Sequence, residues 1–319
     1  MTVRRFQCAS TERLSHVLAG DPAVPYRAHR QRIGHLPFDR WTVDRAGRLL
    51  GNATGAFETC AGAIAWKALP WDSEFFGFPA ARFDVLAVSG GYTEVRDTAS
   101  LLIQKAVDDA AATGVKHIAA RIDASSLSHA HALAESGFEL IDGIQTFALE
   151  LKEAYAEAPG TRLAVPADSG AIGDIARSSF LFDRFHNDVS IGTDAANRLH
   201  EAWARNSLTG QAADAVVVSA TSDAIDTIDA FVTIKVDSGS ASALGLKFAT
   251  IPLVATGLEA RGKGAARRAT QAALAWCATQ SVDIVEVGTQ ISNVPAARLY
   301  QSAGFRTTAI SLTYRKWID

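Results

Sequence analysis

The sequence predicts an α/β protein with a mixed sheet (α+β), and two stretches of the chain support this prediction. The first is an apolar run of strand formers at residues 250–256, which leads through a glycine-rich turn into a helix from Gly264. The second is a strand-like run at residues 284–289, followed by a short helix and the pair Gly304-Phe305. Strands that alternate with helices in this way are typical of α/β sheets.

The glycine-rich turn has the features of an anion-binding site. The unpaired N–H groups at a helix start, together with the helix dipole, attract negative charge. Gly262 and Gly264 have no Cβ, so phosphate oxygens can approach the backbone closely. The helix itself is indicated by apolar residues at the spacing of one helix face, namely Ala265, Ala269, Ala272, Ala273 and Trp276.

Positive charge gathers at this turn, although the chain as a whole has a formal net charge of -3. Arg261, Lys263, Arg267 and Arg268 lie within eight residues of one another, which suits a small polyanionic cofactor. A nucleotide-binding P-loop is disfavoured, because Gly264 stands where that motif needs a Ser or Thr for magnesium. A tight turn before an alanine-rich core helix explains the glycines equally well when the turn is considered alone.

The second stretch favours the cofactor interpretation. Ser292 or Asn293 can cap the short helix, and Asn293, Ala296, Ala297 and Tyr300 fall on one helix face. This face offers an amide, small side chains and a phenol. For a lone tyrosine, a core aromatic whose hydroxyl is tied to the backbone would be the preferred interpretation. Behind a basic glycine turn, we favour a functional phenol.

Together, Arg261-x-x-Gly264-x-Ala266, Asn293, Tyr300 and Gly304-Phe305 resemble the acyl-CoA site of the GNAT superfamily of N-acyltransferases, over about residues 160–319. The resemblance implies a GNAT fold, acetyl-CoA as the acyl donor and no metal. It implies that Tyr300 protonates the departing thiolate and that the strand near Leu253 pairs with pantetheine and offers an N–H to the oxyanion. The implied cofactor-binding residues are Leu253, Val254, Ala255, Arg261, Gly262, Lys263, Gly264, Ala265, Ala266, Asn293 and Ala296.

An internal echo predicts the domain organisation. Residues 117–138 repeat the strand, helix and Gly-Phe pattern of residues 284–305, but Leu133 replaces Tyr300 and no Arg-x-x-Gly-x-Ala loop precedes the copy. We therefore predict a degenerate GNAT-like N-terminal half that has lost the cofactor. The predicted divisions are an extension of unknown role at 1–60, the degenerate domain at 61–155 and the acetyl-CoA-binding catalytic domain at 160–319. A linker is expected at 152–166, a helix at 11–19 and a strand with a turn at 42–50.

Two aromatic-rich segments, residues 69–77 and 179–188, are candidates for acceptor binding. Trp71, Phe75 and Phe76 can stack on a base or sugar, and Arg184 with His186 can meet phosphate. On residue type alone, core aromatics and surface charge pairs are the simpler interpretation. The order of these motifs nevertheless resembles the branch of the superfamily that acetylates dTDP-4-amino-4,6-dideoxygalactose, the dTDP-fucosamine N-acetyltransferases.

That resemblance implies transfer of an acetyl group to the 4-amino group of a dTDP-amino-dideoxysugar for polysaccharide biosynthesis. It also nominates Asp142 as the general base, against the alternative of a solvated loop carboxylate. Acceptors such as an amino acid, an aminoglycoside or a protein N-terminus stay open. So does a non-catalytic acyl-CoA-binding regulatory module, although an intact Tyr300 disfavours it.

Composition limits the remaining classes. A hydrophobic content of 48% with 20% charged residues is ordinary for a globular protein, and no apolar run reaches the length of a membrane helix. The slightly acidic charge disfavours nucleic acid as a partner. Cys8, Cys60 and Cys277 follow no metal-ligand spacing and are expected to be reduced thiols in the cytoplasm. A homodimer stays open.

Overall fold

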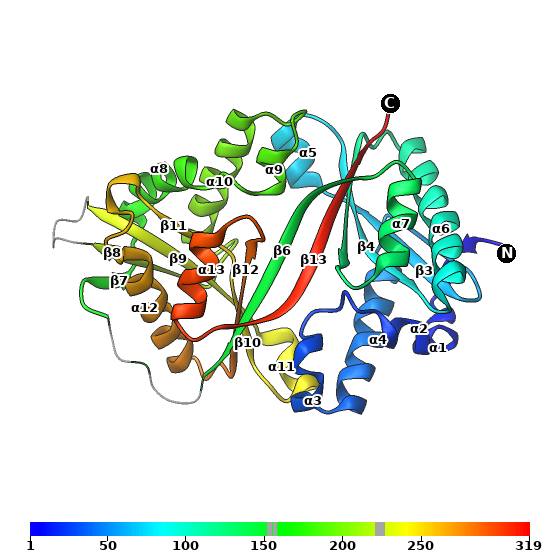
Figure 1. The fold of residues 1–319 in the computed structure, drawn as a ribbon, viewed down its shortest axis with the longest axis horizontal. Coiled ribbons are helices and arrows are strands. Elements are labelled where there is room, and N and C mark those ends of the chain that lie inside the picture. Colours follow the sequence, from blue (N-terminus) through cyan, green and yellow to red (C-terminus); the bar gives the residue numbers. More distant parts are fainter. Residues whose placement is uncertain (152–154, 156–157, 221–226) are drawn as a thin grey trace. The chain divides into compact units, whose positions relative to one another are not determined.

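The computed structural model describes residues 1–151, 155, 158–220 and 227–319, and it divides into two compact units. The first unit comprises Met1–Gly143 and Ile310–Asp319, and the second comprises Ile144–Ala309. Figure 1 labels the elements of both. The expected linker at 152–166 falls partly outside the described residues. The observed division therefore lies before the expected one, and the last ten residues return to the first unit.

The first unit is a mixed sheet with the strand order β1-β2-β3-β4-β5-β13. Strands β4 and β5 run parallel, and the other neighbours in this order run antiparallel. Its elements are β1 (Arg4–Arg5), α1 (Ser10–Arg13), α2 (Ser15–Gly20), η1 (Arg27–His29), α3 (Arg30–Ile33), α4 (His35–Gly51), β2 (Gly55–Glu58), β3 (Gly62–Ala68), α5 (Pro70–Phe76), β4 (Ala80–Val88), α6 (Tyr92–Ala112), β5 (His117–Asp123), α7 (Leu127–Glu135), the start of β6 (Glu139–Glu150) and the end of β13 (Arg306–Trp317).

The N-terminal sixty residues belong to this unit and build one of its two cores. Leu18 of α2 and Leu50 of α4 pack with Leu14 and with alanines and valines of β3 and β4, while α6 and α7 contribute to a separate core. Buried Glu58 fastens the N-terminus, because its Oε1 accepts from Arg4 Nε at 2.7 Å and from Ser10 Oγ at 2.9 Å. These residues are therefore an integral layer of the unit.

The expected strand at 42–50 is wrong, since these residues lie in helix α4. The buried positions of α4 are Phe38, Trp41, Thr42, Ala46 and Leu50, which recur mostly at three and four residues. This spacing gives one apolar face of a helix. Residues 42–50 alone do not show this face, because its first turn, with Phe38 and Trp41, lies before Thr42.

A partly buried carboxyl in this unit predicts a pH-dependent stability. Burial, opposed by the N–H of Ala23 and by Arg27 and Arg45, raises the pKa of Asp21 from 3.8 to about 6. A carboxyl whose folded pKa exceeds its unfolded pKa stabilises the fold below the unfolded value, and this contribution is lost as pH rises through the folded value.

Replacing Asp21 by Asn keeps an oxygen that can accept from Ala23 N–H, which lies 2.9 Å from Oδ1, and removes the titration. We expect Asp21→Asn to gain stability over the parent as pH rises from 4 to 8, by up to about 3 kcal/mol at about 1.4 kcal/mol per pKa unit. Urea unfolding at both pH values measures this gain. An equal stability difference at pH 4 and pH 8 would contradict it.

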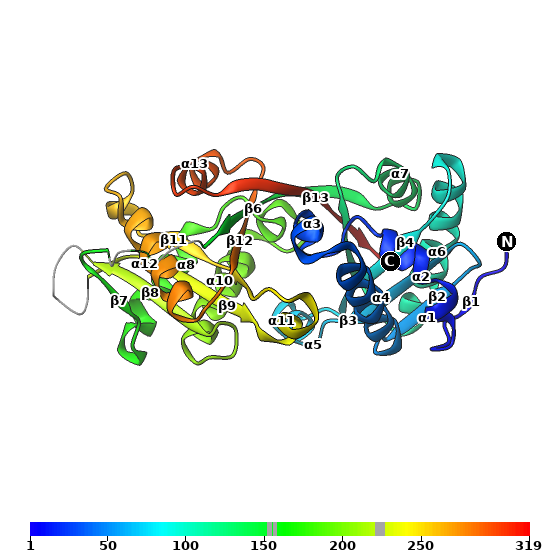
Figure 2. The ribbon, with the colours of Figure 1, turned by 90° about the horizontal axis from the view of Figure 1, so that it is seen from below.

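The second unit is also a mixed sheet, with the order β6-β12-β10-β9-β8-β7, and β11 pairs with β9. Strands β10 and β12 are parallel, and β7, β8 and β9 follow one another antiparallel (Figure 2). Its further elements are β7 (Thr161–Leu163), η2 (Pro166–Asp168), α8 (Ser169–Ser179), α9 (Arg184–Asn187), α10 (Thr193–Leu208), β8 (Ala215–Ala220), β9 (Ile228–Asp237), α11 (Ser238–Leu244), β10 (Phe248–Ile251), β11 (Val254–Thr256), η3 (Leu258–Ala260), α12 (Ala265–Thr279), β12 (Ile284–Gln290) and α13 (Val294–Ser302).

Two cores lie on the faces of this sheet. Helices α12 and α13 pack with Val217 of β8 and Val232 of β9. Helices α8 and α10 pack with the alternate residues Val218 and Phe231 of the same strands. The alternation follows from the two-residue period of a strand, and it leaves the loop before α12 at one end of the sheet.

The predicted echo is present in the order of elements, because β5 and α7 precede Gly137-Phe138 as β12 and α13 precede Gly304-Phe305. In each unit, two parallel strands are connected by a long helix, α6 between β4 and β5 and α12 between β10 and β12. The final strand of each unit comes from the other half of the sequence. Residues Ile144–Glu150 of β6 pair with β12, and Ser311–Trp317 of β13 pair with β5. The predicted α/β mixed sheet is therefore confirmed, with each half completed by a strand from the other half of the sequence.

Candidate active site

The glycine turn has the backbone conformation that the sequence suggested. Gly262 has φ +76° and Gly264 has φ +79°, and Gly264 is the N-cap residue of α12. For a residue with a Cβ, this left-handed backbone conformation costs about 1–2 kcal/mol of conformational free energy. No side chain caps α12, so the N–H groups of its first turn keep their hydrogen-bonding capacity for a ligand. A Cβ at Gly262 would meet no atom within 4 Å, so the backbone here is openly accessible.

The charges beside the turn have different roles. Arg268 supports the loop, since its guanidinium donates to the carbonyl oxygen of Lys263 at 3.2 Å and lies 3.8 Å from Asp229 Oδ2. Arg261 and Lys263 are exposed, and so is Arg267 in the first turn of α12. The loop and helix start thus offer backbone donors and three cations to an anion.

The strand before this turn divides into two parts with different partners. Residues Phe248–Ile251 of β10 pair with both β9 and β12, whereas β11 pairs among the described strands with β9 alone (Figure 1). The two strands are separated by Pro252 and Leu253. Beyond Ile251, the edge of β11 that faces away from β9 pairs with no described strand, and the Thr256 carbonyl oxygen at its end accepts from Ser179 Oγ at 3.2 Å.

Hydrogen bonds identify which N–H groups point to that edge. Thr233 N–H donates to Leu253 O, and Gly257 N–H donates to Asp229 O. Residues 253, 255 and 257 thus face β9, and Val254 and Thr256 face away, because antiparallel neighbours alternate. Leu253 N–H is also occupied, since it donates to Thr233 Oγ1 at 2.9 Å. Of the predicted Leu253, Val254 and Ala255, only Val254 directs its N–H to that edge.

Of the two predicted caps, Asn293 is the N-cap of α13, and its Oδ1 accepts from Ala296 N–H at 3.2 Å. The predicted shared face packs against the core through Ala296, Ala297 and Tyr300. The capping role uses the oxygen of the Asn293 amide and leaves its nitrogen as the group for a ligand contact. This local geometry follows from the preference for Asn at helix starts.

Tyr300 is 3% exposed and packs edge-on against Phe147 at 5.7 Å between ring centroids. Its hydroxyl makes no hydrogen bond to any residue in the described ranges. Among the described residues, some buried polar atoms are sealed from solvent and have no hydrogen-bond partner. The hydroxyl oxygen of Tyr300 is not one of these atoms. The structure thus does not tie this hydroxyl to the backbone. Burial raises the pKa of Tyr300 well above 10, which keeps the phenol protonated.

The predicted acceptor aromatics form a cluster in the first unit, in which Trp71 is exposed and Phe75 and Phe76 are half-buried. Helix α5 has no buried residue, and Trp71 is 43% exposed. Its ring lies 5.5 Å from Phe75, which lies 5.4 Å from Phe76. These aromatics are therefore not core residues, and their faces can stack on a planar ligand.

Asp142 also belongs to the first unit, where it is buried in strand β6. The alternative of a solvated loop carboxylate is therefore wrong. Burial lowers the pKa of Arg121, and the charge of Asp142 opposes this shift. The carboxyl of Asp142 and the guanidinium of Arg121 are therefore close enough to interact electrostatically.

The two polar candidates in α9 differ in their surroundings. The guanidinium of Arg184 lies over the Phe185 ring at 4.4 Å from its centroid. The side chain of His186 is 7% exposed, and its two ring nitrogens contact Asp183 Oδ2 at 2.6 Å and Asn197 Oδ1 at 2.9 Å. Both nitrogens of His186 are thus engaged within the protein.

The sequence interpretation missed the partners of His186, namely Asp183, Asn197 and His200. The available signal was an Asp-x-x-His pair, with a second histidine fourteen residues later on an amphipathic helix. The structure brings ligand atoms of Asp183, His186 and His200 to within 4.8 Å of one another.

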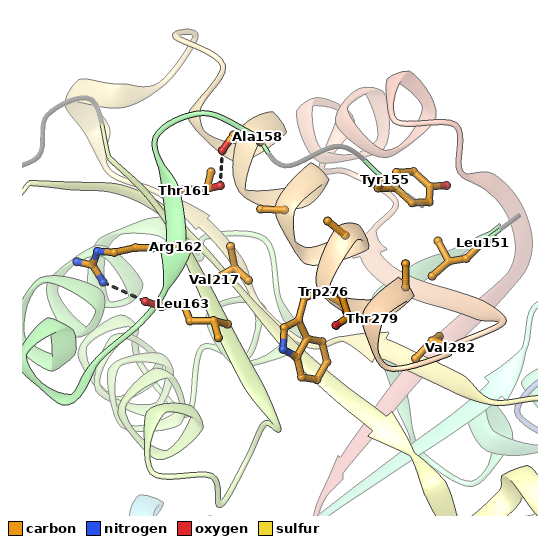
Figure 3. Close-up of a pocket in the computed structure, with 13 residues that line it drawn as sticks. Leu151, Tyr155, Ala158, Thr161, Arg162, Leu163, Val217, Trp276, Thr279 and Val282 are labelled. Carbon is orange, nitrogen blue, oxygen red and sulfur yellow. Dashed lines mark hydrogen bonds between the residues drawn. The ribbon is translucent and has the colours of Figure 1, made fainter. Parts of the chain in front are cut away.

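A cavity of about 680 Å³ in the second unit is distinct from the predicted site. Its lining includes Trp276 and Thr279 from the second half of α12 and Leu163 of β7 (Figure 3). None of the predicted cofactor-binding or catalytic residues lines it. The residues predicted to bind acyl-CoA therefore do not line this cavity.

A family model described as the acetyltransferase (GNAT) family matches residues 184–305. This match extends from α9 to the residue before β13 and contains the glycine turn, the divided strand and Tyr300. Residues 184–305 therefore correspond to a GNAT acetyltransferase domain. Among the described helices, none is long and apolar enough to cross a membrane.

The chain is similar to two curated proteins. It is 30% identical over 152 residues to the spore coat polysaccharide biosynthesis protein SpsD of Bacillus subtilis, a match that covers 48% of this chain and 48% of that protein. It is 24% identical over 240 residues to the dTDP-fucosamine acetyltransferase of Escherichia coli, covering 75% of this chain and 92% of that protein. The chain thus spans about half the length of the first relative and nearly all of the second.

A solved structure supports the two-part fold. The tandem GNAT protein from the clavulanic acid biosynthesis pathway superposes with a TM-score of 0.56 and 14% identity, covering 99% of this chain and 98% of that one. At this identity the likeness concerns the fold alone. It agrees with a tandem arrangement in which the N-terminal half also has GNAT-like topology.

Proposed function

We propose that the chain transfers an acetyl group from acetyl-CoA to the 4-amino group of a dTDP-amino-dideoxysugar. The observation on which the chemistry rests is the buried Tyr300 hydroxyl, which has no partner within the described residues and follows a glycine turn fit for pyrophosphate. The acceptor rests on the similarity to the dTDP-fucosamine acetyltransferase over most of that protein.

In this proposal, the residues at the start of α12 bind the donor. The N–H groups of the first turn and exposed Arg261 and Lys263 hold the pyrophosphate. The outward edge of β11 pairs with the amides of the pantetheine arm, and the amide nitrogen of Asn293 contacts the same arm. These contacts place the thioester carbonyl against the available N–H of Val254.

The chemical step is direct attack of the neutral amine on the thioester carbon. Val254 N–H donates to the oxygen that becomes negatively charged as the tetrahedral intermediate forms, a contact that favours the transition state over the ground state. Tyr300 then gives its proton to the leaving thiolate. Asp142 takes the proton that the ammonium must lose. Trp71, Phe75 and Phe76 stack on the base or sugar, and Arg184 contacts phosphate.

Thiol release from acetyl-CoA tests the acceptor against a panel of dTDP-aminosugars, free aminosugars, amino acids and aminoglycosides. We expect release with a dTDP-4-amino-4,6-dideoxysugar and little with the corresponding free aminosugar, because the nucleotide provides the stacking and phosphate contacts. We also expect Asp142→Asn to lower this rate.

Each other result has a defined meaning. Release with an amino acid or an aminoglycoside in place of the nucleotide sugars would overturn the acceptor and keep the donor chemistry. Binding of acetyl-CoA without release on any amine would favour a regulatory acyl-CoA-binding module.

A further inference from the structure

A compact cluster of one carboxylate and two imidazoles lies outside the proposed donor site. Asp183 precedes α9, His186 lies within α9, and His200 lies in α10. Asp183 Oδ2 is 2.6 Å from His186 Nδ1 and 3.6 Å from His200 Nε2. The three side chains are 11%, 7% and 4% exposed. The cluster is therefore well shielded from water and unlike an exposed acidic patch.

The other polar atoms of these side chains are fixed by neighbours. Asp183 Oδ1 accepts the N–H of Phe185 at 2.8 Å and the N–H of His186 at 3.3 Å, as the N-cap of α9. Asp183 Oδ1 therefore bonds to the first turn of the helix, and Asp183 Oδ2 faces the two imidazoles.

In each imidazole, the ring nitrogen farther from Asp183 lies beside an oxygen. His200 Nδ1 lies 2.9 Å from the carbonyl oxygen of Ala196, and His186 Nε2 lies 2.9 Å from Asn197 Oδ1. An oxygen acceptor at the far nitrogen requires an N–H there, which leaves the near nitrogen of a neutral ring with its lone pair. Once the proton of the 2.6 Å hydrogen bond between His186 Nδ1 and Asp183 Oδ2 has left, three lone pairs converge, from Asp183 Oδ2, His186 Nδ1 and His200 Nε2. A shared cation removes their mutual repulsion.

We propose that Asp183, His186 and His200 bind one divalent transition-metal ion of the zinc class. Two imidazoles and a carboxylate oxygen are ligands that zinc accepts, and hydrogen bonds from ligating histidines to acceptors behind them orient such ligands. With metal–ligand bonds of about 2.0–2.1 Å and tetrahedral angles, ligand atoms lie roughly 3.3 Å apart. The observed separations of 2.6 Å and 3.6 Å bracket that value.

In the absence of the metal, a proton between Asp183 Oδ2 and His186 Nδ1 occupies the short contact. Metal binding displaces this proton, so zinc affinity falls as pH falls.

The bound ion connects α9 to α10 and, through the Phe180 ring that stacks on His200 at 4.4 Å, to the end of α8. It would therefore stabilise the segment that contains Arg184. This role is independent of the proposed acceptor.

Zinc titration of the full chain tests the site after treatment with EDTA, using a chelator of known affinity as competitor. We expect stoichiometric uptake of zinc by the parent and a rise in melting temperature. Cobalt(II) in place of zinc should give the intense visible absorption of a four-coordinate ion. Replacing Asn197 by Ala keeps all three ligands and removes one acceptor behind them, so affinity should fall about 10–100-fold.

Matched variants distinguish this site from adventitious binding. His200→Gln removes a ligand and should weaken zinc binding more than Asn197→Ala. His35→Gln removes an exposed histidine from the first unit and should leave binding unchanged. Failure of the parent to take up zinc stoichiometrically, a six-coordinate cobalt spectrum, or equal affinity in the parent and in His200→Gln would overturn the proposal. The parent measurements decide the question even when a variant does not fold.

Discussion

Replacing Tyr300 by Phe should lower the kcat of acetyl transfer by about 10²–10⁴-fold and leave the Kd for acetyl-CoA nearly unchanged, the range typical of a lost general acid. The substitution removes only the hydroxyl and keeps the ring that packs against Phe147 and Phe305. Because burial raises the pKa of Tyr300 well above 10, the parent rate should show no loss from deprotonation of Tyr300 up to pH 10.

Steady-state kinetics with saturating acceptor and a direct acetyl-CoA binding measurement separate the two effects. Tyr314 is a matched control, since it is buried at 6% exposure and burial also raises its pKa, but it lies in the core of the first unit. We expect Tyr314→Phe to retain the parent kcat. A Tyr300→Phe enzyme with parental kcat would remove the acid role from this residue.

Replacing Gly264 by Ala should weaken acetyl-CoA binding by about 10–100-fold. Gly264 has φ +79° at the start of α12, where a Cβ disfavours the conformation that directs the first-turn N–H groups at the ligand. A lost hydrogen bond to a charged group costs about 1.5–3 kcal/mol, which corresponds to this change in affinity.

Gly210 provides the control for backbone strain. It has the same φ of +79°, and a Cβ there would meet no atom within 4 Å. Gly210→Ala should therefore lose about 1–2 kcal/mol of stability, as Gly264→Ala does, while binding acetyl-CoA like the parent. Equal affinities in the two variants would refute the anion-binding role of the α12 start. Isothermal titration and thermal unfolding of both proteins give the comparison.

The donor site was largely predictable from the sequence because its parts are local. The positive φ of Gly262 and Gly264, the cap at Asn293 and the helix starts depend on residues within a few positions. The direction of the Val254 N–H was not predictable. It depends on where the strand breaks at Pro252 and on its pairing register with β9, which are properties of the assembled sheet.

The remaining differences have the same origin in non-local packing. His186 was expected to meet phosphate, but the structure surrounds its ring with Asp183 and with Asn197 from the next helix. The sequence also indicated no metal ligands, because the spacing of Asp183, His186 and His200 matches no familiar motif. Their convergence depends on how α9 packs beside α10.

The exchange of final strands has a consequence for dissecting this protein. A fragment of residues 160–319, which a linker at 152–166 would suggest, discards Ile144–Glu150 and so exposes one edge of β12. The same cut separates β5 from the residues of β13 that pair with it. Each half would then present an unsatisfied strand edge, which is prone to association. A cut at this linker therefore leaves neither sheet complete, because each unit takes one strand from the other side of the cut.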